Sequence, residues 1–169
     1  RKTATHAQGT EGIMNALRAG IDSIEHGFWL SDEAIELMLK NRVGYVPTLA
    51  AIHYIIVNGE KGVIPVEFVD KAKRVTEAHH TSLEMARKAG VLIGMGTDAG
   101  TPFNRHGHNA NEMELMVKAG MSPAEALVSA TGDGAKILDL EGRLGLVKEG
   151  LLADLVVVEG NPVEDISLT

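Results

Sequence analysis

The order of short apolar runs and amphipathic segments is the feature that most restricts the fold of this chain. Runs that predict strands cover residues 1–7, 21–27, 43–49 and 91–98. Helical spacing of apolar residues predicts helices at residues 13–20, 31–41, 65–88, 110–119 and 123–131. Strands that alternate with helices in this way favour parallel βαβ units and an α/β fold.

After residue 140 the pattern changes. Residues 142–145 predict a turn, and the β-branched run at residues 153–158 predicts a strand outside the repeat. We therefore divide the chain into an α/β unit, residues 1–140, and a C-terminal β segment, residues 141–169.

The carboxyl ends of three predicted strands carry side chains that bind metals. His6, His26 and Asp98 each stand at or near the last position of their strand. In parallel α/β folds these ends meet at one edge, where barrel enzymes place their catalytic groups. Two imidazoles and a carboxylate suit a hydrolytic metal site, in which the carboxylate also takes a proton from water. We expect all three as metal ligands and Asp98 as the catalytic residue.

Each of these residues alone has a simpler explanation. A single histidine at a strand end is often a hydrogen-bonded structural residue, and an aspartate there often caps the next helix. Corresponding positions on three strands of one series favour the metal site instead. Because the chain has no cysteine, only nitrogen and oxygen ligands are available, which suits zinc, manganese or iron.

The polar loop that follows Asp98 carries three candidates for substrate binding. Arg105, His106 and His108 would overhang the same edge of the sheet. The guanidinium of Arg105 can bind both oxygens of a substrate carboxylate. The alternative is a solvated loop without contact to a ligand.

Three other histidines are expected to lie outside the metal site. His53 falls in residues 50–64, a stretch with two glycines that we interpret as a loop or lid. His79 and His80 lie in a predicted helix that is rich in charges, so we expect them on its solvated face.

Composition excludes some classes of function. The net charge of −7 argues against a nucleic-acid partner, because phosphates require a basic surface. No apolar run is long enough to cross a bilayer, so we expect no membrane span, while the location in the cell stays open.

Five stretches of the chain together resemble the amidohydrolase superfamily. They are Thr5-His6-Ala7-Gln8-Gly9, Ile24-Glu25-His26-Gly27, Gly96-Thr97-Asp98-Ala99-Gly100, His106-Gly107-His108-Asn109 and the run at residues 150–157. They occur in the family's order and extend over nearly the whole chain. The most similar groups are the Xaa-Pro dipeptidases, which are prolidase-like, and the arginine carboxypeptidases, with imidazolonepropionase as a more distant relative.

The resemblance implies half of a (β/α)8 TIM-type barrel, strands five to eight, plus C-terminal strands of a small β-sandwich at residues 142–162. It assigns His6 and His26 to the metal histidines of the fifth and sixth strands. Asp98 matches the acid of the eighth strand, which binds metal and transfers a proton to the leaving amine. The implied reaction is hydrolysis of an amide bond in a dipeptide or N-acyl amino acid, with one or two divalent metal ions, Zn²⁺ first among them.

Other family features have no match in these residues. The His-x-His pair of the first strand and the lysine of the fourth strand are absent, so we expect a C-terminal fragment with weak activity or none. A half barrel leaves two sheet edges unpaired, so we expect a homo-oligomer or a separate N-terminal half as partner. The alternative is a structural half barrel that assembles with a partner chain and has no catalysis.

Overall fold

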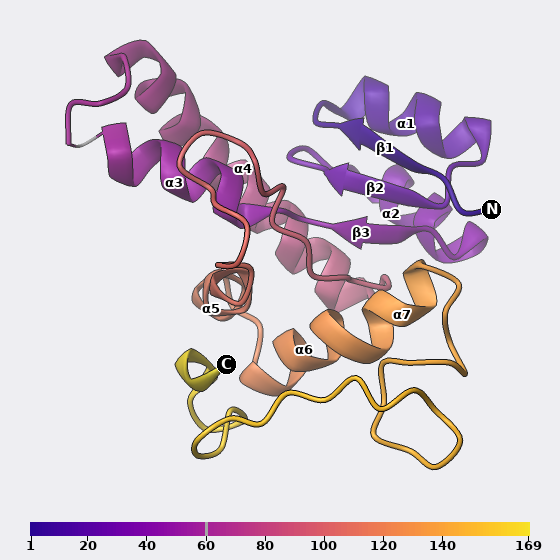
Figure 1. The fold of residues 1–169 in the computed structure, drawn as a ribbon. Helices are drawn as coiled ribbons and strands as arrows, with labels where there is room; N and C mark the ends of the chain where they lie inside the picture. Colours follow the sequence, from indigo (N-terminus) through magenta and orange to yellow (C-terminus); the bar gives the residue numbers. More distant parts are fainter. Residues whose placement is uncertain (60) are drawn as a thin grey trace.

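A small parallel sheet forms the centre of the computed structural model, which describes residues 1–59 and 61–169. Its three strands lie in sequence order: β1 (Ala4–Ala7), β2 (Ser23–His26) and β3 (Gly44–Val46). The register sets Ala7 of β1 opposite His26 of β2. The carboxyl ends of the strands therefore lie along one edge of the sheet (Figure 1), and the predicted α/β fold with parallel strands is confirmed.

Helices follow each strand and cover the sheet. They are α1 (Thr10–Ala19), α2 (Asp32–Asn41), α3 (Leu49–Gly59), α4 (Val66–Ala89), α5 (Asn111–Lys118), α6 (Pro123–Val128) and α7 (Gly134–Ile137). A π-helical turn, Ser129–Asp133, joins α6 to α7, and a 3-10 turn, Ile166–Leu168, lies near the C-terminus. The apolar spacing of α1 buries Ile13 and Leu17 in a common core with Ile24 of β2 and Met38 of α2.

The fourth predicted strand is present only as a short extension of the sheet. Ile93 forms an isolated parallel bridge with Tyr45 of β3. Tyr45 donates its backbone N–H to the carbonyl of Leu92 at 2.8 Å, and Gly94 donates to the carbonyl of Tyr45 at 2.9 Å. The polypeptide that leads to Asp98 thus runs beside β3, and its assignment to the last strand of a barrel stays a prediction.

The prediction of a loop at residues 50–64 is wrong for most of that stretch. Helix α3 extends from Leu49 to Gly59 and packs along α4 (Figure 1). The glycines that suggested a loop, Gly59 and Gly62, lie at or beyond the helix end. The side chain of Glu112 in α5 accepts backbone N–H groups at the helix start. The interpretation of this stretch as a lid is likewise replaced by a packed helix.

The prediction of a strand at residues 153–158 is also wrong. In the described part of the chain, residues 141–169 contain no strand, and this segment runs in extended form below α5 and α6 (Figure 1). Val156 and Val157 are 87% and 95% exposed, because no neighbouring strand in the described residues pairs with them. The β-sandwich therefore stays a prediction, as does the domain boundary at residue 140.

Within the described residues, no helix has both the length and the apolar character that a membrane crossing demands.

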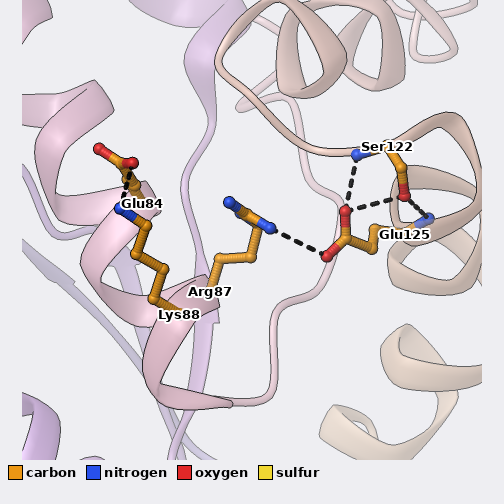
Figure 2. A network of polar contacts seen from close by, with 5 residues as sticks. All are labelled: Glu84, Arg87, Lys88, Ser122 and Glu125. Atoms are coloured by element: carbon orange, nitrogen blue, oxygen red, sulfur yellow. Dashed lines mark hydrogen bonds and ion pairs between the residues drawn. The ribbon is translucent and has the colours of Figure 1, made fainter.

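A polar network joins the end of α4 to the start of α6 (Figure 2). Ser122 caps α6 by accepting the backbone N–H of Glu125, and the Glu125 carboxylate accepts the backbone N–H of Ser122 at 2.6 Å. Arg87 of α4 adds an ion pair with Glu125 at 3.3 Å. The same view shows Lys88 paired with Glu84 within α4, at 2.6 Å.

Replacing Ser122 with alanine removes the reciprocal cap and should lower the free energy of unfolding by about 1 kcal/mol. Lys88→Ala is the matched control, because its pair with Glu84 is exposed to solvent and contributes little to stability. Urea denaturation followed by circular dichroism measures both. Equal losses in the two variants would contradict the capping role of Ser122.

Candidate metal centre

Two predicted ligands, His6 and His26, meet at the carboxyl ends of β1 and β2. Their ring centroids lie 4.4 Å apart with an interplanar angle of 67°. The parallel register brings the two strand ends side by side, because His26 pairs with Ala7, the residue after His6. The left-handed φ of 73° at His26 then departs from the alternation of faces along the strand and allows the two rings to meet. His6 is exposed, whereas the side chain of His26 is buried. The structure thus brings together two imidazoles from adjacent strands, one of them open to solvent.

His26 is held by β3 and by the segment that follows it. Its Nδ1 lies 2.7 Å from the hydroxyl oxygen of Thr48, which is itself buried. The hydroxyl of Tyr45 donates to the backbone carbonyls of His26 and Gly27, at 3.0 Å and 3.3 Å. Burial lowers the pKa of His26, the neighbouring His6 lowers it further and Asp98 opposes both effects. The neutral ring is therefore favoured, which is the form that binds metals.

The turn after β2 depends on Gly27. This residue has a φ of 53°, and a Cβ atom there would lie 2.6 Å from the Tyr45 ring. Only glycine allows both the left-handed backbone and the close contact with Tyr45. The glycine that follows His26 is therefore required by the packing of Tyr45 and by the backbone of the turn.

Asp98 lies at the same edge with an exposed side chain and a left-handed backbone, φ 54°. Its charge acts on both His26 and Glu25. The pKa of Glu25 is raised mainly by burial, a hydrogen bond from Ser23 opposes the shift, and Asp98 adds to it. These electrostatic effects place Asp98 near His26 and Glu25.

The loop after Asp98 is closed by a residue that the sequence interpretation missed. Asn104 is buried, and its side-chain amide donates to the carbonyls of Thr97 and Asp98. The backbone N–H of Gly100 donates to the carbonyl of Asn104 at 2.8 Å. An asparagine in a glycine-rich turn was the available signal.

The three predicted substrate residues lie on this loop and are exposed. The Nε2 atom of His106 lies near Gly100, 3.8 Å from the position of a Cβ there, so its ring folds back toward the segment after Asp98. Arg105 and His108 flank it in the sequence. Contact of Arg105, His106 or His108 with a substrate stays a prediction.

The donor set in the described residues fits part of a metal site. His6 and His26 offer two nitrogen ligands, and Asp98 offers an accessible carboxylate. Across residues 1–59 and 61–169, however, no group of three or more histidine, aspartate or glutamate side chains converges closely enough to hold a metal ion. Metal binding by His6, His26 and Asp98 stays a prediction, and a complete coordination shell would need further ligands.

Behind the site lies a buried carboxylate that the sequence did not single out. Glu112 of α5 is fully buried and accepts the backbone N–H groups of Leu49 at 2.6 Å and Ala50 at 2.8 Å. These amides begin α3, so Glu112 caps that helix from a distant part of the chain. Burial raises the pKa of Glu112 to about 8, against the opposing effect of the two amides.

His79 contradicts the expectation of a solvated helix face. It is 1% exposed, and its ring lies 4.5 Å from that of Phe28, which in turn lies 6.0 Å from His26. Burial lowers the pKa of His79 to about 4. Its Nε2 atom has no hydrogen-bond partner among the described residues. The face of α4 that carries His79 therefore packs under the site.

The family model for the amidohydrolase family matches residues 1–169. The chain therefore belongs to the amidohydrolase family, and the predicted resemblance is confirmed. The structure resembles that of a Xaa-Pro dipeptidase with bound methionine in the active site, with 41% identity and a TM-score of 0.88 over 99% of this chain and 41% of the other.

Two further relatives agree with this assignment. The ochratoxinase of Aspergillus niger is 32% identical over 99% of this chain and 34% of its own length, and its crystal structure gives a TM-score of 0.86. The imidazolonepropionase of Rubrobacter xylanophilus is 31% identical over 43% of this chain and 18% of its own length. The chain spans only about a third to two fifths of the dipeptidase and the ochratoxinase.

Glu112 should make the stability of the fold depend on pH. Its pKa is about 8 in the folded chain, above the ordinary value of 4.5, so the folded state binds more protons than the unfolded state between these values. Stability is then full below pH 4.5 and falls as the pH rises toward 8, by up to about 1.4 kcal/mol per pH unit.

Denaturation from pH 5 to 8 tests this effect. Glu112→Gln cannot titrate, so its stability should vary less with pH than that of the unchanged chain. Glu67→Gln makes the same chemical change at an exposed position of α4 and serves as control. The expectation fails if Glu112→Gln retains the full pH dependence.

Proposed function

We propose that this chain supplies part of the active site of a metal-dependent amide hydrolase. The observation that carries the proposal is the approach of His6 and His26 at 4.4 Å at the carboxyl ends of adjacent parallel strands. Membership in the amidohydrolase family supports the reaction class.

In this proposal His6 and His26 bind a divalent metal ion, for which Zn²⁺ suits the imidazole ligands. A bound divalent metal polarises the carbonyl that is attacked and makes a water molecule acidic near neutral pH. The lowered pKa of His26 keeps its ring neutral and able to donate a lone pair. The proposed site holds one or two divalent ions.

Asp98 is the proposed proton carrier. Its carboxylate is exposed at the edge where His26 lies, so it can take a proton from water and pass it to the departing amine. The Asp98 carboxylate would also serve as a ligand to the metal ion. Asp98 is thus the catalytic residue of the proposal.

The proposed substrates are dipeptides or N-acyl amino acids, whose amide bond lies beside a carboxylate. The similar dipeptidase holds methionine, an amino acid with a free carboxylate, in its active site. Arg105 would bind such a carboxylate through its guanidinium, and His106 and His108 would contact the substrate from the same loop.

The remaining ligands come, in this proposal, from a further part of the family domain or from a second copy of the chain. Two observations support this need: no group of three ligands converges in the described residues, and the chain spans 41% of the similar dipeptidase. We propose an oligomer or an assembly with the other half barrel as the active form.

Activity in the longest expressed protein that carries these residues tests the proposal. Loaded with Zn²⁺, it should release amino acids from Xaa-Pro dipeptides or N-acyl amino acids. Asp98→Asn should reduce kcat by at least about 100-fold, because proton transfer is lost. Release of free amine, measured with a chromogenic reagent, follows the reaction.

Asp70→Asn provides the matched control, since it makes the same change on the exposed start of α4. It should retain normal turnover, and circular dichroism should show both variants folded. Undiminished turnover by Asp98→Asn, or no hydrolysis by the unchanged protein with any of these substrates, would refute the proposed function.

A further inference from the structure

We infer that Thr48 is a positioning residue that fixes the tautomer of His26, so that Nε2 of this ring carries the lone pair that faces a metal. The inference deepens the proposed function and rests on it for the identity of the ligand. Thr48 lies just beyond the end of β3, and its hydroxyl makes two hydrogen bonds, to Pro47 and to His26.

Thr48 has a single hydroxyl hydrogen, and that hydrogen is already used. Its Oγ1 lies 2.6 Å from the carbonyl oxygen of Pro47, which can only accept. The hydroxyl therefore donates to Pro47. In its second contact, at 2.7 Å from Nδ1 of His26, the same oxygen must accept. It follows that Nδ1 carries the proton.

A neutral imidazole has one protonated and one unprotonated nitrogen. With the proton on Nδ1, the Nε2 atom of His26 presents its lone pair. Metal-binding histidines are oriented in this way, since an acceptor on the other nitrogen fixes the tautomer and turns the ring toward the metal. The packing of His6 against the same ring is consistent with a ligand that both share.

The backbone of Thr48 shows that the position is held firmly. Its φ is 55°, a left-handed conformation that a β-branched residue rarely adopts. The next two backbone amides, of Leu49 and Ala50, donate to the buried carboxylate of Glu112. Glu112 thereby anchors the residues that follow Thr48 and keeps its hydroxyl beside His26.

The backbone of His26 is held as well. Its φ is 73°, also left-handed, and its carbonyl accepts the Tyr45 hydroxyl at 3.0 Å. Both partners of the contact between His26 and Thr48 therefore have backbones fixed by buried groups of other elements. This preorganisation is what a ligand needs if its ring orientation is to be set before the metal arrives.

The test uses Thr48→Val and Thr48→Ser. Valine has the shape and β-branching of threonine, so the cost of the left-handed backbone stays similar while the acceptor is lost. Serine keeps the hydroxyl and should rescue the effect. The first readout is long-range ¹⁵N–¹H NMR of the His26 ring in metal-free protein, which distinguishes protonation at Nδ1 from protonation at Nε2.

The unchanged chain and Thr48→Ser should show His26 protonated at Nδ1, and Thr48→Val should show a substantial Nε2–H population. Zn²⁺ affinity, measured by competition with a chromophoric chelator, should fall about 10- to 100-fold in Thr48→Val and recover in Thr48→Ser. Protonation at Nε2 in the unchanged chain, or an unaltered tautomer and affinity in Thr48→Val, would overturn the inference.

The NMR readout separates this inference from the proposed function. If the unchanged protein neither binds Zn²⁺ nor hydrolyses amides but His26 is protonated at Nδ1 through Thr48, the proposed function fails while the positioning by Thr48 stands. If hydrolysis is observed and His26 is protonated at Nε2, the reverse holds. Should Thr48→Val not fold, the tautomer of the unchanged chain and of Thr48→Ser still decides.

Discussion

The parallel pairing of β1 with β2 is the constraint on which the site depends. It places Ala7 opposite His26, so that the histidine at the end of each strand reaches the same edge and the two rings meet at 4.4 Å. His26 ends its strand with a left-handed φ of 73°, which departs from the alternation of faces along β2 and allows its ring to meet that of His6. The core beneath fixes this register, because Ile24 and Tyr45 are fully buried between the strands and the covering helices.

Buried polar groups then convert this strand arrangement into a defined site. Tyr45 holds the carbonyl of His26, Thr48 contacts its ring, and Glu112 holds the start of α3 just after Thr48. Each of these groups belongs to an element that is distant in the chain from His26. Burying a carboxylate such as Glu112 is costly unless its oxygens accept hydrogen bonds, so its place at the two amides couples α5 to the site. The side chains of His6 and Asp98 stay exposed at this edge and are accessible to a ligand.

The sequence predicted what short-range patterns determine. Apolar spacing identified α1, α2 and α4, and the acidic or histidine residues at strand ends marked the edge where His6 and His26 meet. Contacts between residues far apart in the sequence could not be predicted from these patterns. The helix at Leu49–Gly59 needs Glu112 as its cap, and the burial of His79 needs the packing of α4 under Phe28. The prediction of a strand at residues 153–158 is wrong because a contact is missing: its β-branched residues have no strand to pair with in the described chain.

The central claim is that this chain contributes two imidazoles to one divalent metal ion, and equilibrium titration with Zn²⁺ tests it most directly. Calorimetry of the metal-free protein should show stoichiometric binding, weakened at least about 10-fold by either His6→Ala or His26→Ala. His80→Ala, a histidine on α4 outside the proposed ligand set, should bind as the unchanged protein does. Binding that is insensitive to both site variants, or no binding by the unchanged protein, would contradict the account.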